Sequence, residues 1–174
     1  MVKVSLVNIL IADHRRLEGM FERCLDSHTR HDQEEMVDKI IKTLAVHTLI
    51  EEDHVFPLLK ELNKEDALEA YEEHHAIKVL VDELMNCKCD HETTRAKVKV
   101  LGEIMEHHHE EEEKKLFPML LESDFDLFDI GREMLEHKSE LERHIHFAIS
   151  ALHEEIQAGP CATSGKSKCA FAAA

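Results

Sequence analysis

The sequence predicts an all-α protein, an antiparallel up-down four-helix bundle with an additional C-terminal helix. Leu, Ile and Val are plentiful, while the 174 residues include only 5 Gly, 3 Pro and no Trp, a composition that favours helices over sheets. Apolar residues recur every three or four positions along several long segments, as in helices with one face on a core. The connections between these segments are short, so consecutive helices are expected to be antiparallel neighbours.

The first two predicted helices form one hairpin. The first runs from about residue 5 to 27, and the second, capped by Asp32, extends to about residue 62. Pro57 lies inside the second helix and predicts a kink or a local break there. The core-facing stripes are Leu6, Leu10, His14, Leu17, Phe21 and Leu25 in the first helix, and Val37, Ile40, Leu44, His47, Glu51, Val55, Leu58 and Leu62 in the second.

A second hairpin and a fifth helix follow. The third helix spans about residues 64–86, the fourth about 92–121, and the fifth, expected along the outside of the bundle, about 127–157. Gly159-Pro160 ends the regular structure. We therefore expect one domain over residues 1–158 and a disordered tail over 159–174. The stripes of the second hairpin are Ala67, Tyr71, His74, Ile77, Val81 and Leu84, then Val98, Leu101, Met105, His108, Glu112, Leu116 and Met119.

Polar residues interrupt these stripes at six core-facing positions. Burying an unpaired carboxylate costs several kcal/mol or more, so such a group is normally paired, hydrogen-bonded or bound to a metal. Six such residues on four helices indicate a shared cause. They are His14, His47, Glu51, His74, His108 and Glu112.

The same six residues follow an internal repeat. His47 and Glu51 are four positions apart, so they lie on one helix face, one turn from each other. His108 and Glu112 repeat this spacing 61 residues later, and His74 follows His14 by 60. Each hairpin thus supplies one lone His and then one His-x-x-x-Glu, followed in both by Phe-Pro.

Packed together, the two hairpins would bring four imidazoles and two carboxylates to one interior point. That set suits two metal ions, each bound by two His and both bridged by the two Glu, with positions left open for a small ligand. Imidazole and carboxylate ligands without thiolate favour Fe or Mn, with Zn possible. A buried polar network without metal is the alternative.

These residues resemble the hemerythrin-like family, also called the HHE cation-binding domain, over about residues 5–157. The resemblance rests on Asp13-His14, the two His-x-x-x-Glu segments with their Phe-Pro, Glu73-His74, and Ile130-Gly131-Arg132-Glu133-Met134 with Lys138. It implies a centre of two iron ions with an oxo or hydroxo bridge. Such a centre binds oxygen, peroxide or nitric oxide.

The sequence departs from the oxygen-carrying members at two places. They have a fifth His one turn after the lone His of the third helix, where this chain has Lys78, and a wider His-to-Asp spacing where this chain has His108-x-x-x-Glu112. A site with fewer His leaves more open coordination. This favours sensing, peroxide or nitric oxide chemistry, or iron handling over simple oxygen transport. We expect a di-iron protein that binds or senses oxygen or a related small diatomic. The alternatives are an enzyme that decomposes peroxide or reduces nitric oxide, and an iron-responsive interaction module.

A ferritin-like centre is the nearest structural rival. It would use Glu-x-x-His on two helices, and both Glu51-x-x-His54 and Glu106-x-x-His109 fit that string. However, Glu106 lies off its stripe and His54 aligns with Lys115 in the repeat.

Four further residues near the predicted ligands are assigned secondary roles. His107 and His109 are expected to flank His108 without joining the centre. His54 is either an outer partner or an extra ligand. Tyr71 either fills the core or donates a hydrogen bond to a bound ligand.

Charge and cysteine content limit the partners and the setting. A formal net charge of -16 argues against nucleic-acid binding, which needs a basic face. Five Cys, with Cys161 and Cys169 in the tail, give an odd count without a disulfide framework, which indicates a reduced, cytoplasmic setting. No signal peptide and no membrane span are expected. The oligomeric state stays open.

Overall fold

The computed structural model describes the backbone of residues 5–86 and 91–158, and the side chains of residues 5–85 and 92–145. Regular structure in these ranges is helical throughout, which confirms the all-α prediction. The predicted tail and Cys87, Cys89, Cys161 and Cys169 lie outside the described residues. The elements are α1 (Leu6–Leu25), α2 (Arg30–His54), α3 (Phe56–Leu62), α4 (Lys64–Asn86), α5 (His91–Glu111), a π-helical turn η1 (Glu112–Leu116), α6 (Phe117–Leu121) and α7 (Leu127–Ala158).

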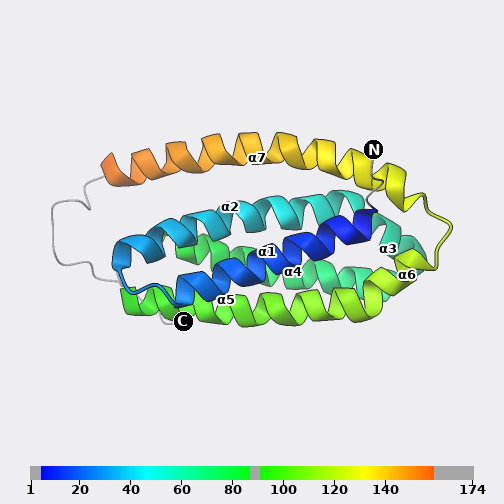
Figure 1. Cartoon of the computed structure of the whole chain (residues 1–174), viewed down its shortest axis with the longest axis horizontal. Helices are drawn as coiled ribbons and strands as arrows, with labels where there is room; N and C mark the ends of the chain where they lie inside the picture. Colours follow the sequence, from blue (N-terminus) through cyan, green and yellow to red (C-terminus); the bar gives the residue numbers. More distant parts are fainter. Residues whose placement is uncertain (1–4, 87–90, 159–174) are drawn as a thin grey trace, which may run out of the picture.

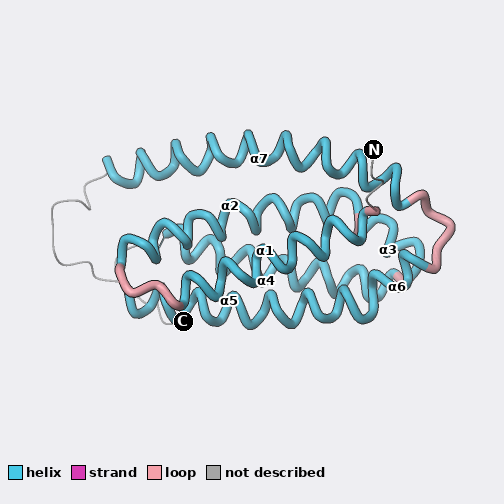
Figure 2. The backbone as a smooth tube through the Cα atoms, viewed as in Figure 1, coloured by secondary structure: helices cyan, strands magenta, loops and turns pink. Residues whose placement is uncertain are grey.

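Four long antiparallel helices form the bundle (Figure 1). α1 packs against α2 and α5, and α4 packs against α5 and α2, so the four helices enclose one interior. The short helices α3 and α6 continue α2 and α5 at one end, and short loops join the elements (Figure 2). α7 lies along the outside, against α1 and α2. The architecture is therefore the predicted four-helix bundle with an additional C-terminal helix.

Side-chain caps fix where the first two helices begin. The Ser5 hydroxyl accepts the backbone N–H of Asn8, and the Thr29 hydroxyl accepts that of Asp32 at 3.1 Å. The prediction that Asp32 is the cap was wrong by three residues. The Asp32 carboxylate instead accepts the Thr29 hydroxyl at 2.7 Å.

The two Phe-Pro sequences distort the helices directly after the Glu of each repeat. Pro lacks the N–H that would bond four residues back, so α2 ends at His54 and α3 begins at Phe56. At the second site the N–H of Phe117 reaches back five residues to the Glu112 carbonyl, which makes the π-helical turn. A continuous helix over 92–121 was predicted there, although Pro118 carried the same signal as Pro57.

The break before Phe56 also changes which side chains face the core. Leu59 is buried, whereas Leu62, predicted on the core stripe, is 41% exposed. The predicted stripe continues past Val55 as if the helix were unbroken. The break rotates the residues that follow it, so Leu59 faces the core in place of Leu62.

The apolar core is divided into two clusters. One lies at the end formed by α3 and α6 and includes Leu10, Ile50 and Leu116. The other includes Leu17, Leu44 and Leu101. On α1 the two clusters are separated by the turn that carries His14. A layer of buried polar residues therefore crosses the bundle between two apolar halves.

α7 is held to α1 by a close backbone approach and a buried ion pair. A Cβ at Gly131 would lie 2.7 Å from the backbone nitrogen of Leu6, so only glycine permits this contact. Two turns further along both helices, the Lys138 ammonium pairs with the carboxylate of Asp13, which is 6% exposed. Gly131 and Lys138, two of the residues that resemble the family in the segment 130–138, therefore hold α7 against α1.

Substituting Gly131 by Ala should therefore destabilise the protein. The added methyl group meets backbone, which cannot rotate away, so we expect a loss of about 1–3 kcal/mol in the free energy of unfolding, as for other overpacked sites. The matched control is Gly19→Ala on α1, where the structure places no described atom within 4 Å of the new Cβ. That substitution should stabilise by about 0.5–1 kcal/mol, because Ala is the better helix former. Urea denaturation of both variants decides, and equal effects would contradict the packing described.

Candidate metal centre

All six polar residues of the predicted site meet in the layer between the two apolar clusters. α1 supplies His14, α2 supplies His47 and Glu51, and α4 supplies His74. His108 comes from α5, and Glu112 begins the π-helical turn. Each side chain is 1% exposed or less. That these residues bind metal stays a prediction, but their convergence is what such a site requires.

The distances between nitrogen and oxygen atoms match the spacing of ligands around a metal ion. His47 Nε2 and His74 Nε2 lie 3.3 and 3.4 Å from Glu51 Oε2, and His14 Nε2 lies 3.7 Å from Glu51 Oε1. Two ligands about 2.1 Å from one ion would be roughly 3.0–3.4 Å apart. Glu51 therefore faces imidazoles from both hairpins.

Glu112 has the corresponding position on the other hairpin. Its Oε2 lies 3.3 Å from His14 Nε2 and 3.6 Å from His108 Nε2. The ligand atoms fall into two overlapping groups, each spanning no more than 4.8 Å: Glu51 with His74 and His108, and both carboxylates with His14 and His47. Glu51 belongs to both groups, as a carboxylate that bridged two cations would.

Three imidazoles are oriented by carboxylates behind them. His14 Nδ1 lies 2.8 Å from Glu113, and His74 Nδ1 lies 2.9 Å from Glu52. The partner of His108 Nδ1 is Glu73, at 2.7 Å.

These contacts determine which ring nitrogen faces the interior. An Nδ1–H donated to a carboxylate leaves Nε2 as the atom directed inward, which is the arrangement typical of metal-binding His. His74 Nε2 and His108 Nε2 are only 3.0 Å apart. Two lone pairs at that distance repel each other unless a proton or a cation lies between them.

His47 lacks such a partner among the described residues. The repeat places Asp13 where Glu73 stands in the other hairpin, but the Asp13 carboxylate pairs with Lys138 of α7 instead. The two halves of the site are therefore not equivalent, and α7 is the cause.

Burial and the two carboxylates shift the pKa values of the imidazoles in opposite directions. Burial lowers the pKa of His14, but Glu112 and Glu51 outweigh it and raise the pKa to about 10. The pKa of His74 rises to about 9, because Glu51 and Glu52 likewise outweigh burial. Burial dominates at His47, whose pKa falls to about 3 despite Glu51.

The two carboxylates also differ from each other. Burial opposes ionisation of Glu51, yet His47, His14 and His74 hold its pKa well below the usual range. Burial and the charge of Glu51 raise the pKa of Glu112. In the metal-free layer the raised pKa values of His14 and His74 keep protons on imidazoles whose Nε2 atoms a cation would need.

Buried atoms without partners provide a test of whether a metal fits. Seven atoms of the cluster have no hydrogen-bond partner within the described part of the chain: His14 Nε2, both ring nitrogens of His47, and all four carboxylate oxygens of Glu51 and Glu112. Each such buried group costs about 1–3 kcal/mol. Nitrogen and oxygen donors directed at one interior point are the set that Fe, Mn or Zn ions bind. The residues therefore fit a metal centre.

The Phe of each Phe-Pro covers the lone His of the opposite hairpin. The Phe56 ring lies 4.7 Å from that of His74, and the Phe117 ring lies 5.6 Å from that of His14. Both Phe side chains are fully buried. Each copy of the repeat thus supplies both a carboxylate and, five residues later, a Phe that covers the site.

The structure adds His109, which was expected only to flank His108. His109 is 1% exposed, and neither ring nitrogen has a hydrogen-bond partner among the residues described. Its ring stacks on His14 with centroids 3.8 Å apart and planes 5° apart. One ring nitrogen lies within 4.8 Å of ring nitrogens of both His14 and His47. A usable signal existed, because His109 follows the core residue Met105 by four positions.

The other candidates lie away from the centre. The Tyr71 hydroxyl donates to the Glu52 carbonyl at 3.2 Å, so it supports the backbone. His54 pairs with His137 of α7 at 3.0 Å. Glu106 and His107 are exposed. The ferritin-like arrangement therefore receives no support from Glu106 or His54.

A buried layer of imidazoles and carboxylates inside a four-helix bundle has the composition of a cation site. The chain matches the family described as the hemerythrin HHE cation binding domain over residues 5–120, and it belongs to that family. Its fold is similar to that of a hemerythrin HHE cation binding domain-containing protein from Mycobacterium kansasii, with a TM-score of 0.69 and 20% identity, covering 91% of this chain and 96% of that one. A comparison with curated protein sequences finds no match. None of the described helices has the length and apolar character of a membrane span.

Replacing His109 by Phe should stabilise the metal-free protein. The substitution keeps a ring against His14 and removes two buried, unpaired nitrogens, so we expect a gain of about 1 kcal/mol or more in the free energy of unfolding. Denaturation of EDTA-treated protein at pH 8, where free His is neutral, measures it. A loss of stability would show that the His109 nitrogens have partners.

Metal binding should release protons at neutral pH. His14 and His74 have raised pKa values of about 10 and 9, so both are protonated at pH 7 without metal. Their Nε2 atoms must lose protons to bind a cation, so about two protons should leave per chain at pH 7. Affinity should then rise with pH up to about pH 9–10 and fall toward acid. Zn²⁺ added to metal-free protein with a pH indicator tests this, and binding without proton release would contradict it.

Proposed function

We propose that this protein holds two iron ions between its hairpins and uses them to bind or sense oxygen or a related small diatomic ligand. His14, His47, His74 and His108 would be the nitrogen ligands, and Glu51 and Glu112 the bridges. An oxo or hydroxo group would complete the centre. When bound, such a pair of irons supplies reversible electron transfer to a small ligand.

One observation carries the proposal: a fully buried layer of imidazole and carboxylate groups whose inward atoms have no hydrogen-bond partner in the described structure. Membership of a cation-binding family supports metal in that layer. The donor set favours iron or manganese over zinc, because carboxylate bridges with imidazoles suit metals that accept more than four ligands.

The surroundings of the layer favour a small ligand. Four His and two Glu give about four donors per metal, which leaves positions open. Phe56 and Phe117 cover the layer on the side of α3 and α6. A diatomic molecule can cross such packing, whereas a larger substrate would need a cleft that reaches the metals.

Iron analysis and an absorption spectrum of the reconstituted protein test the proposal. We expect two irons per chain and bands that change when oxygen is admitted and return when it is removed. Sustained turnover of peroxide above that of free iron would favour the enzyme alternative. A spectrum indifferent to oxygen and nitric oxide, with fewer than two irons, would overturn the proposal.

Paired substitutions separate the bridge from its neighbour. Glu51→Gln removes a carboxylate directed at both metal positions, so the protein should retain at most one tightly bound iron. Glu52→Gln alters only the partner of His74 Nδ1 and Lys78, so it should keep both irons with affinity weakened about 10–100-fold, the usual effect of an outer partner. Chelator competition measures both. Equal iron content and affinity in the two variants would contradict the assigned roles.

A further inference from the structure

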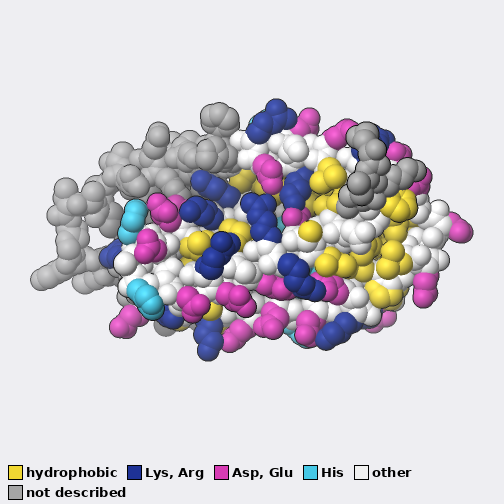
Figure 3. Space-filling model, viewed as in Figure 1, with side chains coloured by type: hydrophobic (Ala, Val, Ile, Leu, Met, Phe, Trp, Pro, Cys, Tyr) yellow, Lys and Arg dark blue, Asp and Glu magenta, His cyan; other side chains and the backbone are white. Residues whose placement is uncertain are grey.

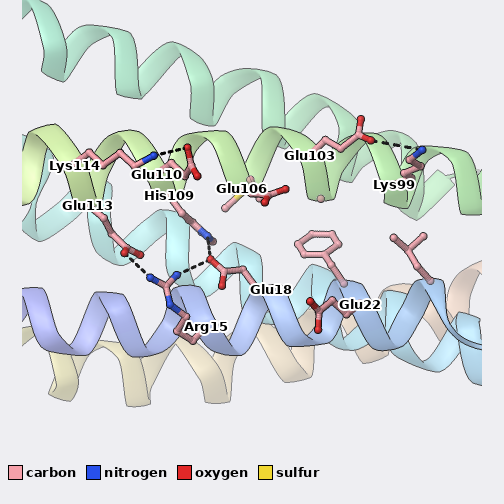
Figure 4. A pocket seen from close by; sticks show the side chains of 14 residues that line it. Arg15, Glu18, Glu22, Lys99, Glu103, Glu106, His109, Glu110, Glu113 and Lys114 are labelled. Atoms are coloured by element: carbon pink, nitrogen blue, oxygen red, sulfur yellow. Dashed lines mark hydrogen bonds and ion pairs between the residues drawn. The ribbon is translucent and has the colours of Figure 1, made fainter.

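A pocket of about 540 Å³ lies between α1 and α5, beside the buried centre. Figure 4 shows side chains of both helices converging on it, with His109 reaching from α5 toward Glu18 of α1. None of the six proposed ligands lines this pocket, and neither does Phe56 or Phe117. The function proposed above therefore leaves this pocket unexplained.

The rim of the pocket is acidic. Six carboxylates line it against three cationic side chains. Acidic side chains also gather along the α5 edge of the face shown in Figure 3. A cleft with excess charge of one sign concentrates ions of the other sign and speeds their arrival. The six carboxylates are Glu18, Glu22, Glu103, Glu106, Glu110 and Glu113.

His109 forms the floor of the pocket. It is buried, its nitrogens have no hydrogen-bond partner among the described residues, and its Nδ1 lies 3.5 Å from Glu18 Oε1. On the inner side, one of its nitrogens lies within 4.8 Å of those of His14 and His47. A continuous series of cation ligands therefore runs from the rim to the centre.

Stacking prevents His109 from sharing one ion with His14. A metal lies in the plane of the imidazole that binds it, and these two rings are nearly parallel and 3.8 Å apart. One ion cannot lie in both planes. In this arrangement the two imidazoles can bind a cation only in turn, which distinguishes His109 from a permanent ligand.

Arg15 closes the outer side of this path. Its guanidinium donates to Glu18 at 2.7 Å and to Glu113 at 2.5 Å. Arg15 is itself about half exposed. It thus neutralises Glu18, the carboxylate beside His109, and Glu113 at the rim.

We infer that the pocket between α1 and α5 is the uptake route for the divalent cations of the centre, with His109 as the transfer ligand between Glu18 and the pair His14 and His47. This inference rests on the proposed metal centre. It gives a role to His109, whose two buried ring nitrogens have no hydrogen-bond partner among the described residues.

Stopped-flow loading of metal-free protein with Co²⁺ tests the route. His109→Phe keeps the stacked ring without nitrogens and should slow loading, while the final spectrum and the two bound ions per chain are unchanged. Glu18→Gln with Glu106→Gln should slow loading by about tenfold at low ionic strength and weaken its salt dependence. Glu69→Gln, at an exposed position on α4 outside the pocket, is the control with unchanged loading.

Each outcome is decisive. Slower loading with an unchanged end point supports the route, and circular dichroism of the metal-free variants establishes that they are folded. Unchanged rates in both pocket variants would overturn the route while leaving the metal centre intact. Loss of one ion in His109→Phe would make His109 a permanent ligand and overturn the transfer role. Failure of the unsubstituted protein to bind two ions would instead overturn the proposed function.

Discussion

The fold depends on how a layer of buried charge is accommodated between two apolar clusters. A bundle of this size would be more stable with Leu at these positions, because each unpaired buried donor or acceptor costs about 1–3 kcal/mol. The chain offsets part of that cost by exchanging partners between its hairpins. Glu113 of the second hairpin orients His14 of the first, and Glu52 of the first orients His74 of the second. The inward atoms remain without hydrogen-bond partners in the described part of the chain, and bound cations would satisfy them.

The two halves of the site follow the repeat but are not identical. α7 takes Asp13 away from His47 through Lys138, and His109 stands where the first hairpin has the buried Thr48. Both differences fall on the side of His14 and His47. Lys78, which occupies the position of a fifth His in oxygen carriers, pairs with Glu52 and so supports His74 on the other side. The two metal positions should therefore differ in affinity and in access.

Much of this arrangement could be predicted from the sequence. Helical periodicity gave the five long helices, and the repeat identified the six polar residues that converge. Three features were not predicted. Asp32 and Thr29 are both capping residues, and only the local geometry selects Thr29. The π-helical turn depends on whether the chain relieves Pro118 by a break or by an extra residue. His109 was assigned to the flank because one apolar stripe was assumed, whereas α5 packs against both α1 and α4 and buries a wider arc.

The central claim is that two cations occupy the layer between the hairpins. Anomalous diffraction at the iron absorption edge from crystals of the iron-loaded protein tests it most directly. We expect two anomalous peaks, one between His14 and His47 and one between His74 and His108, with Glu51 within bonding distance of both. Peaks confined to the surface, or a layer that excludes iron while its side chains keep their positions, would contradict the claim.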